Sequence, residues 1–321
     1  MPKLRIDTFL LLIFGSAVLA LLLPATGGAA GLVDAATKAA IFALFLGYGA
    51  RLSLVEAWAG LRHWKLHLLI LGITFLLFPL IALGILALPD GLLGPSLALG
   101  FAYLCLVPST VQSSITFTSI AGGNVAGAMV SATASNLLGV VVTPLLAVLI
   151  LPSAGGQSIS LDSFVAVLLQ LLLPFVLGQL SRPLTSAFMG RHGKRIKMLD
   201  QFVIALVVYG AFSHFFASGA WRKVELVELF VMIALCLVLL AVMLWFTWWL
   251  GGALHFSRED RIAIMFCGTK KSLATGVPMA SVLFAGQAVG LIVLPLMVFH
   301  QAQLMACTVI AQRLADRNKP V

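Results

Sequence analysis

The stretch FCGTKKSLATGV, residues 266–277, places two adjacent lysines, Lys270 and Lys271, inside an apolar segment long enough to span a membrane. A charged side chain at the centre of a bilayer costs about 3 kcal/mol or more, so such residues are rare and mark ion and substrate pathways. Neighbouring like charges also repel each other, by about 4 kcal/mol at roughly 4 Å and an effective dielectric constant of 20. The pair therefore indicates a functional site within a membrane helix.

The composition of the whole chain agrees with this interpretation. Hydrophobic residues make up 61% of the 321 residues and charged residues only 10%, which is too apolar for a water-soluble domain. The four cysteines lie in apolar runs and lack the spacing of a disulfide framework or a zinc site. The apolar N-terminal stretch resembles a signal peptide, but we expect it to be retained as a first helix. The sequence predicts an all-α integral membrane protein.

We expect ten transmembrane helices, because about 20 apolar residues are needed to cross about 30 Å of hydrocarbon. Their approximate ranges are 7–23, 35–50, 66–88, 93–121, 124–151, 161–181, 198–217, 225–254, 259–284 and 286–312. Most of the 20 Lys and Arg fall in connections that share one side when both termini are cytoplasmic, as the positive-inside rule requires. The pattern predicts a bacterial inner (plasma) membrane protein, and it explains the formal net charge of +9 without a nucleic-acid partner.

The hydropathy pattern also predicts two repeats, residues 1–155 and 156–321, with five helices each. Shifting the first five segments by half the chain length places each near its counterpart in the second set. Because five is odd, the second repeat enters the membrane from the opposite side. Inverted repeats are typical of secondary transporters, whose binding sites lie near the bilayer midplane at discontinuous helices.

Candidate discontinuities occur at matching places in the fourth and ninth helices. The fourth contains CLVPSTVQSSITFTS, residues 105–119, and the ninth contains CGTKKSLATG, residues 267–276. Proline removes a backbone donor and glycine loosens a helix, so the freed backbone groups need polar partners in a membrane. An alternative is an ordinary proline kink with Ser and Thr packing between helices. The candidate site residues in these segments are Pro108, Ser109, Thr110, Gln112, Ser113, Ser114, Thr269, Lys270, Lys271 and Ser272.

The motifs PSTVQSSI (108–115), GGNVAGAMVSATASNLLGVVVTPLL (122–146), CGTKKSLATGVPMA (267–280) and LPLMVFHQAQLMA (294–306) resemble the bile acid:sodium symporter family, specifically its sodium-bile-acid-symporter-like branch. The resemblance covers nearly the whole chain. It implies a panel domain, formed by helices one, two, six and seven, and a core domain formed by the other six. It also implies that the fourth and ninth helices unwind and cross, with an organic anion bound between the domains.

The resemblance further implies sodium ligands, but this chain departs from that pattern. Ser113 and Ser114 match a Ser-Asn pair of sodium ligands in relatives, Thr133 and Ser135 lie near other hydroxyl ligands, and Thr74 replaces a glutamine. Relatives also carry a glutamate and a Gln-Asn pair at the ninth-helix break, where this chain has an apolar residue and the two lysines. All 11 Asp and Glu of this chain lie in loops or at helix ends. We therefore assign no metal site. If sodium does bind, we expect its ligands to be Ser113, Ser114 and Thr133.

Three roles are open for the lysines. An ammonium group could take the place of a sodium ion among hydroxyl and freed carbonyl oxygens, could exchange a proton during transport, or could attract an anionic substrate. We favour the first two, and the alternative is that both side chains reach toward water. On the tenth helix, His300, Gln301 and Gln303 could extend a proton path or line the crossing, although such residues more often bind neighbouring helices.

The favoured function is secondary transport of a small organic anion by alternating access, either linked to protons or independent of sodium. The alternatives are a sodium-coupled symporter with altered ion sites, an uncoupled channel or sensor, and a membrane-embedded enzyme, for which no catalytic motif is present. We expect no cofactor beyond a coupling ion, sodium or a proton. The expected partners are the substrate and the lipid bilayer, with the protein a monomer or weak oligomer. The sequence does not identify the substrate.

Overall fold

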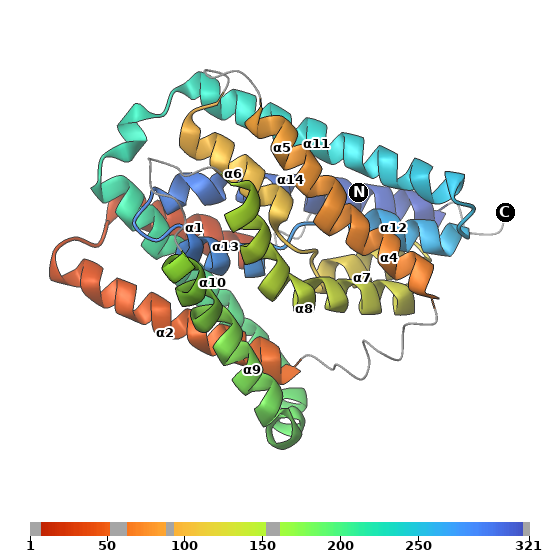
Figure 1. The fold of residues 1–321 in the computed structure, drawn as a ribbon, viewed down its shortest axis with the longest axis horizontal. Coiled ribbons are helices and arrows are strands. Elements are labelled where there is room, and N and C mark those ends of the chain that lie inside the picture. The colour runs from red at the N-terminus through yellow and green to blue at the C-terminus, as the bar shows by residue number, and fades with distance from the viewer. Residues whose placement is uncertain (1–7, 52–62, 88–92, 152–160, 317–321) are drawn as a thin grey trace. The chain divides into compact units, whose positions relative to one another are not determined.

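A computed structural model describes residues 8–51, 63–87, 93–151 and 161–316, and all regular elements in these ranges are helices (Figure 1). Six of them are long and apolar enough to cross a bilayer: Gly28–Arg51, Trp64–Leu86, Val125–Ile150, Gly193–Ala217, Leu226–Ala253 and Val289–Asp316. Many large hydrophobic side chains are exposed on these helices. The expectation of an all-helical integral membrane protein is therefore confirmed.

Each predicted apolar segment coincides with one helix or with two or three consecutive helices. In chain order these are α1 (Thr8–Leu22), α2 (Gly28–Arg51), α4 (Trp64–Gly72), η2 (Ile73–Leu77), α5 (Phe78–Leu86), α6 (Pro95–Leu106), α7 (Gln112–Ile120), α8 (Val125–Ile150), α9 (Leu161–Arg191), α10 (Gly193–Ala217), η4 (Ala220–Lys223), α11 (Leu226–Ala253), α12 (Arg258–Thr269), α13 (Leu273–Leu283) and α14 (Val289–Asp316). Helix α2 begins at Gly28 rather than near residue 35. The number and direction of the membrane crossings stay predictions.

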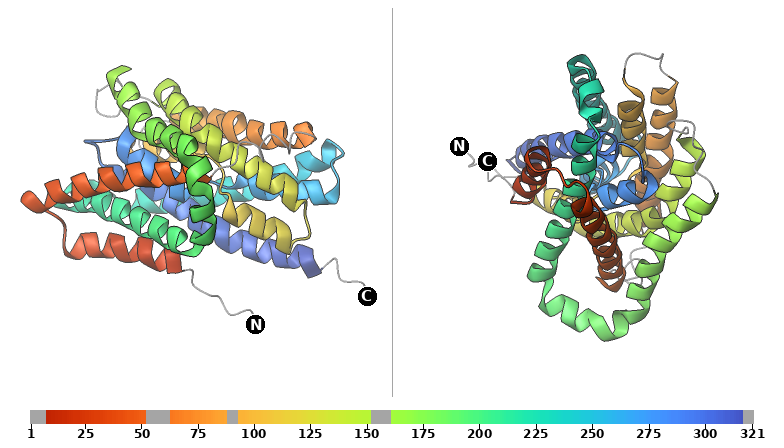
Figure 2. Two further views of the ribbon diagram at one scale, coloured as in Figure 1. Left: turned by 90° about the horizontal axis from the view of Figure 1, so that it is seen from below. Right: turned by 90° about the vertical axis from the view of Figure 1, so that its left-hand side faces the viewer.

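The chain forms two compact units. The first contains α1, α2, α9, α10 and residues Val277–Leu291. Within it α2 packs against α9, and their backbones touch because Gly49 and Gly178 have no side chains: an added Cβ on either would collide with a carbonyl oxygen of the other helix. Arg51 and Asp200 form an ion pair between α2 and α10 at 2.6 Å. Figure 2 shows these helices from two further directions.

The second unit contains α4 to α8, α11, α12 and most of α14. Its centre is α6, where every residue from Leu99 to Leu106 is buried. Helix α6 can approach the backbone of α14 because Gly100 faces the Ile292 carbonyl, where a Cβ would not fit. Both lysines of the opening motif belong to this unit.

Two helices of the second unit are interrupted, as the sequence predicts. Helix α6 ends at Leu106 and α7 begins at Gln112; Val107 is extended, with φ −71° and ψ 143°. Helix α12 ends at Thr269 and α13 begins at Leu273; Lys270 is extended in the same way, with φ −79° and ψ 146°. Pro108 explains the first break, because the residue before a proline avoids the helical region. The second break contains no proline, so its partners must hold it open.

A third irregularity is the short π-helix η2, between α4 and α5. The Phe78 N–H bonds to the Ile73 carbonyl, five residues back, and Pro79 has no N–H at all. The Thr74 carbonyl therefore has no donor at either the i+4 or the i+5 position. This free carbonyl becomes part of the site described below.

Candidate functional site

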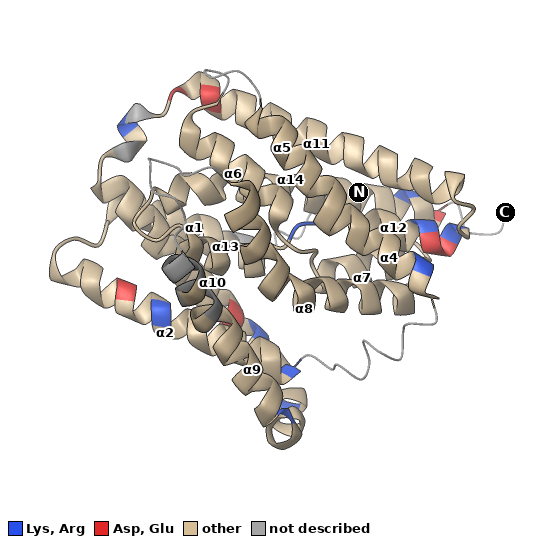
Figure 3. Ribbon diagram, viewed as in Figure 1, with Lys and Arg blue, Asp and Glu red and all other residues tan. Residues whose placement is uncertain are grey.

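The two helix breaks lie against each other inside the second unit. We call residues 107–111 and 270–272 together the junction. Ser272 N–H donates to the Pro108 carbonyl at 2.8 Å, and the Ser109 hydroxyl donates to the Cys267 carbonyl at 2.6 Å. In Figure 3, where Lys and Arg are blue, the segment that joins α12 to α13 contains blue residues.

The carbonyl groups of residues 105–109, at the end of α6 and in the first break, all have partners. Thr143 donates to Leu106 O at 2.9 Å, and the Asn136 side-chain amide donates to Ser109 O. The Pro108 carbonyl takes the Ser272 N–H, as described above. The remaining two carbonyls, of Cys105 and Val107, accept from Lys271. Five consecutive carbonyls are thus satisfied without a helical bond, which is the condition for an open helix in a membrane.

The Lys271 ammonium lies in a cage of backbone carbonyls. Its Nζ is 2.9 Å from Cys105 O, 2.9 Å from Val107 O and 3.4 Å from Thr74 O. The ring of Phe78 covers it, with the ring centroid at 3.9 Å. Carbonyl oxygens at a helix C-terminus and an aromatic face both attract a cation. The break in α6 and the π-helix η2 together therefore build a cation site, and Lys271 fills it.

The backbone of Lys271 is held by a second side chain, Gln303 of α14. The Gln303 Oε1 accepts from Lys271 N–H at 3.0 Å, and its Nε2 donates to Lys271 O at 3.1 Å. This amide replaces the two peptide partners that an unbroken helix would supply. His300 Nδ1 lies 3.0 Å from Gln303 Nε2. The same Nδ1 lies 3.1 Å from the Lys271 carbonyl oxygen, so it donates to that carbonyl in one tautomer of a neutral His300 and accepts from Gln303 Nε2 in the other.

Lys270 has a different environment, although it is also completely buried. Its ammonium lies over the ring of Phe117, with the centroid at 3.8 Å, and near that of Phe266 at 5.8 Å. It has no hydrogen-bond partner among the described residues. The alternative in which the lysines reach toward water is wrong for this conformation, since both are 0% exposed.

Other predicted site residues also gather at the junction. Ser109 N–H donates to Ser135 Oγ at 3.0 Å, and Ser114 Oγ donates to Phe266 O at 3.2 Å. Thr110 Oγ1 lies 2.6 Å from Ser113 Oγ and 3.1 Å from Ser114 Oγ, so these three hydroxyls mainly bind one another. In the part of the chain that is described, no hydrogen bond joins them to either lysine amine.

Four predicted site residues have no part in this network. Thr269 bonds back to its own helix, through Met265 O at 2.6 Å. Gln112 is exposed at the start of α7. Thr133 is half-buried on α8, and Gln301 Oε1 is buried without a partner among the described side chains and backbone. The structure therefore supports the pairing of the breaks more strongly than these individual assignments.

Several residues that hold the junction are not in the predicted set. They are Asn136 and Thr143 on α8, Gln303 on α14, Phe78 and Phe117. Gln303 follows His300 by three residues, and its sequence context favours an ordinary contact with a neighbouring helix over a role in the site. The main ligands of the Lys271 ammonium are backbone carbonyls, which carry no side-chain signal.

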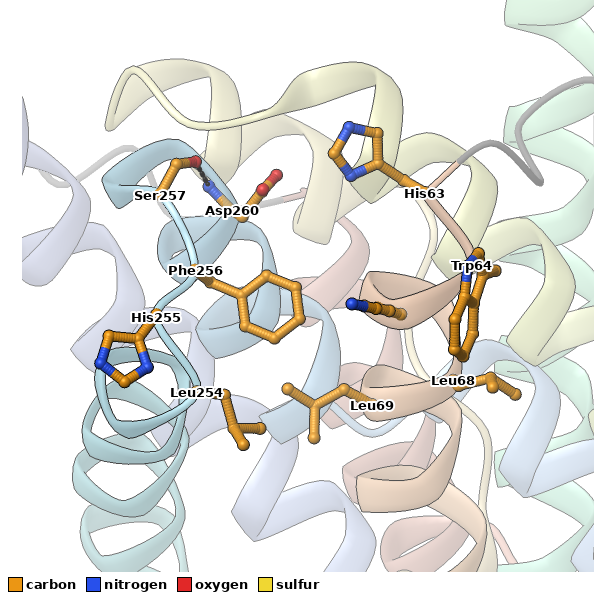
Figure 4. A pocket seen from close by; sticks show the side chains of 10 residues that line it. His63, Trp64, Leu68, Leu69, Leu254, His255, Phe256, Ser257 and Asp260 are labelled. Carbon is orange, nitrogen blue, oxygen red and sulfur yellow. Dashed lines mark hydrogen bonds between the residues drawn. The ribbon is translucent and has the colours of Figure 1, made fainter.

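A pocket of about 880 Å³ lies at the start of α4 and the connection from α11 to α12 (Figure 4). Asp260 lines it, next to the α12 N-cap Ser257, whose hydroxyl accepts from Asp260 N–H at 3.1 Å. The Asp260 carboxylate also accepts from Asn124, the N-cap of α8, at 2.7 Å. Asp260 therefore ties two helix starts together, and the pocket is apart from the junction.

Within the described residues, no group of three or more His, Cys, Asp or Glu is placed to hold a metal ion. A sodium ion in a protein prefers oxygen ligands, and a nearby carboxylate helps to offset its charge. No described carboxylate lies within 4 Å of the amine of Lys270 or Lys271. The carboxylates that come this close to a basic side chain in the described ranges are Asp200, next to Arg51, and Asp34, next to His214.

Comparison with known proteins identifies the relatives of this chain. The model of the SBF-like CPA transporter family matches residues 7–316. The protein PA2026 of Pseudomonas aeruginosa is 46% identical over 99% of this chain and 95% of its own length. The "Putative symporter YfeH" of Escherichia coli is 45% identical, covering 96% of this chain and 92% of its own. Sodium/bile acid cotransporter 7 of Xenopus tropicalis is 29% identical, covering 97% and 92%. The resemblance inferred from the sequence is confirmed.

Proposed function

Because the chain belongs to the SBF-like CPA transporter family, we propose that it is a secondary transporter that moves an organic anion by alternating access, with the Lys271 ammonium in place of a sodium ion. The family and its relatives support transport related to that of bile acid:sodium symporters. We ourselves propose two further points: that transport does not depend on sodium, and that the substrate is an anion.

The observation that carries this proposal is the carbonyl cage around Lys271. Three backbone oxygens and an aromatic face converge on one cation, at distances of 2.9 to 3.4 Å from the oxygens. A sodium ion placed there would meet a fixed ammonium, and it would have no carboxylate nearby among the described groups to offset the combined charge. The residues present therefore do not fit the sodium site of a symporter.

We further propose ten helices in two inverted repeats. Three features support this: α6 and α12 are both 12 residues long, each ends in an extended residue, and each is followed by a short helix. The membership of the two compact units also supports the panel and core domains that the resemblance implies. In such a fold, an open junction near the bilayer midplane gives a substrate access from either side in turn.

The test is uptake of a radiolabelled organic anion into proteoliposomes that contain the purified protein. We expect uptake to be unchanged when choline replaces sodium on both sides. Uptake that needs an inward sodium gradient would contradict the proposal and favour the altered sodium symporter. Rapid flux that ignores every ion gradient and does not saturate would favour a channel.

An imposed pH gradient extends the same assay to the coupling ion. If a proton takes the role of the coupling ion, an inside-alkaline gradient drives accumulation of the anion above its external concentration. If accumulation does not occur with either gradient, the protein equilibrates its substrate as a facilitator. Lys65, which is exposed on α4, provides a matched control, because Lys65→Met removes a lysine without touching the junction.

A further inference from the structure

From the contrast between the two lysines, we propose that the Lys270 ammonium is the group that recognises the negatively charged head of the transported anion. This inference rests on the proposed transport function and deepens it: it names a recognition residue and requires a substrate with a carboxylate or similar anionic group. The ring of Phe117 covers this ammonium.

The two lysine amines differ in their hydrogen-bond partners. Lys271 Nζ is held by the carbonyls of Cys105, Val107 and Thr74, and these contacts stabilise the junction itself. Lys270 Nζ has three N–H donors and no acceptor among the described residues. Lys270 therefore contributes nothing to the network that holds the two breaks together.

The described hydroxyl groups at the junction form hydrogen bonds with other groups and not with the Lys270 ammonium. Ser114 donates to Phe266 O, and Ser109 donates to Cys267 O. The Thr110 and Ser113 hydroxyls are 2.6 Å from each other. The ammonium is thus left with the faces of Phe117 and Phe266, which attract a cation but accept no full hydrogen bond.

The charge of the Lys270 ammonium also lacks a partner among the described groups. Two ammonium groups are buried side by side, and the carbonyl cage compensates one of them. A buried charge without a partner is costly, so it calls for an opposite charge. In the described ranges the junction has no carboxylate of its own, since the ion pairs lie elsewhere. A mobile anion supplies the missing charge and accepts the three free N–H groups.

Phe117 covers the Lys270 amine. Its ring lies against Lys270 Nζ, and it also contacts Phe266 at 5.9 Å between centroids. Phe117 is 9% exposed, whereas Lys270 is 0% exposed. Phe117 is therefore the more exposed of the two rings over the amine, and binding of an anion in this proposal requires its side chain to rotate away from Lys270.

The experiment measures the melting temperature of the purified full-length protein in an uncharged detergent, with benzoate and pyruvate as choline salts. Benzamide, which has nearly the shape of benzoate without its charge, is the matched ligand control. A ligand that binds the folded state raises its melting temperature by mass action. We expect wild type and Lys65→Met to respond to a carboxylate but not to benzamide.

The decisive variants are Lys270→Met and Lys270→Arg. We expect Lys270→Met to weaken carboxylate binding at least about tenfold, the effect of losing a charged hydrogen bond of about 1.5–3 kcal/mol, and Lys270→Arg to retain part of the response. Without ligand, Lys270→Met should melt at the same temperature as wild type or higher, because an unpartnered charge has been removed.

Three results would overturn the inference. The first is a carboxylate response of Lys270→Met equal to that of wild type. The second is a wild type that transports an anion but shows no response to either carboxylate. A melting temperature of ligand-free Lys270→Met far below that of wild type would show that its amine has partners and would also contradict it. Failure of the proposed function itself is recognised separately, by the absence of any uptake in proteoliposomes.

Discussion

At the scale of single residues, adjacent lysines of identical chemistry have different surroundings. Lys271 donates to carbonyls at the end of α6, whereas Lys270 rests on the ring of Phe117. The difference comes from the extended backbone at Lys270, which sends consecutive side chains in opposite directions. The pair therefore combines a structural cation with an unpaired one.

This difference predicts opposite effects of the same substitution. Lys271→Met should lower the melting temperature strongly, because two well-bonded carbonyls and the Thr74 carbonyl lose their donor, at about 1–3 kcal/mol for each buried group. The measurement is thermal unfolding in detergent, with Lys65→Met as the surface control. Equal stability of Lys271→Met and Lys65→Met would show that the carbonyl cage contributes nothing.

At the scale of elements, the breaks are held open by side chains from neighbouring helices. Gln303 on α14 binds both backbone groups of Lys271, and Asn136 and Thr143 on α8 bind carbonyls of the first break. Each amide or hydroxyl takes the place of a peptide group in an unbroken helix. The long helices α8 and α14 thus act as fixed supports for the short ones.

Gln303→Leu should therefore destabilise the protein by about 1–3 kcal/mol, since the buried N–H of Lys271 loses its partner, whereas the Lys271 carbonyl still has His300 Nδ1 at 3.1 Å. Gln303→Glu keeps the acceptor for Lys271 N–H and loses the donor, so we expect an intermediate loss. Thermal unfolding of the two variants gives the comparison. If Gln303→Leu is as stable as wild type, the amide does not hold the break.

Pro79→Ala tests the origin of the Thr74 carbonyl contact. An alanine restores an N–H in the helix that runs from α4 to α5, and this donor competes with Lys271 for a carbonyl of η2. We expect the unfolding temperature to be kept or raised, because proline in a helix interior costs about 3 kcal/mol, while the uptake rate falls. An unchanged uptake rate would mean that the π-helix has no role in the site.

The elements and the breaks could be predicted from the sequence, and the site only in part. Apolar segments gave the helix ranges closely, and Pro108 with its polar neighbours marked the first break. The lysine pair marked the second. The carbonyl ligands of Lys271 could not be predicted from the sequence, because every residue has the same backbone oxygen. The role of Thr74 could not be predicted either, since it acts through its carbonyl rather than its side chain.

At the scale of the whole molecule, the chain combines the architecture suggested by its relatives with a changed ion site. The family match extends over residues 7–316, yet Lys270 and Lys271 stand where the resemblance implies an amide pair. Under the proposed function, the tethered ammonium of Lys271 would stay at the junction throughout a transport cycle, because it cannot leave the protein. Sodium, in contrast, would be released and rebound once in each cycle.

The most direct test of this account is the effect of sodium on the melting temperature of wild type and of Lys271→Ser, with choline chloride at equal ionic strength as the reference. Wild type should not respond to sodium, because the ammonium fills the carbonyl cage. Lys271→Ser leaves the cage and a new hydroxyl vacant, so sodium should raise its melting temperature by mass action. A wild type that sodium stabilises, to the same degree as it stabilises Lys271→Ser, would contradict the central claim.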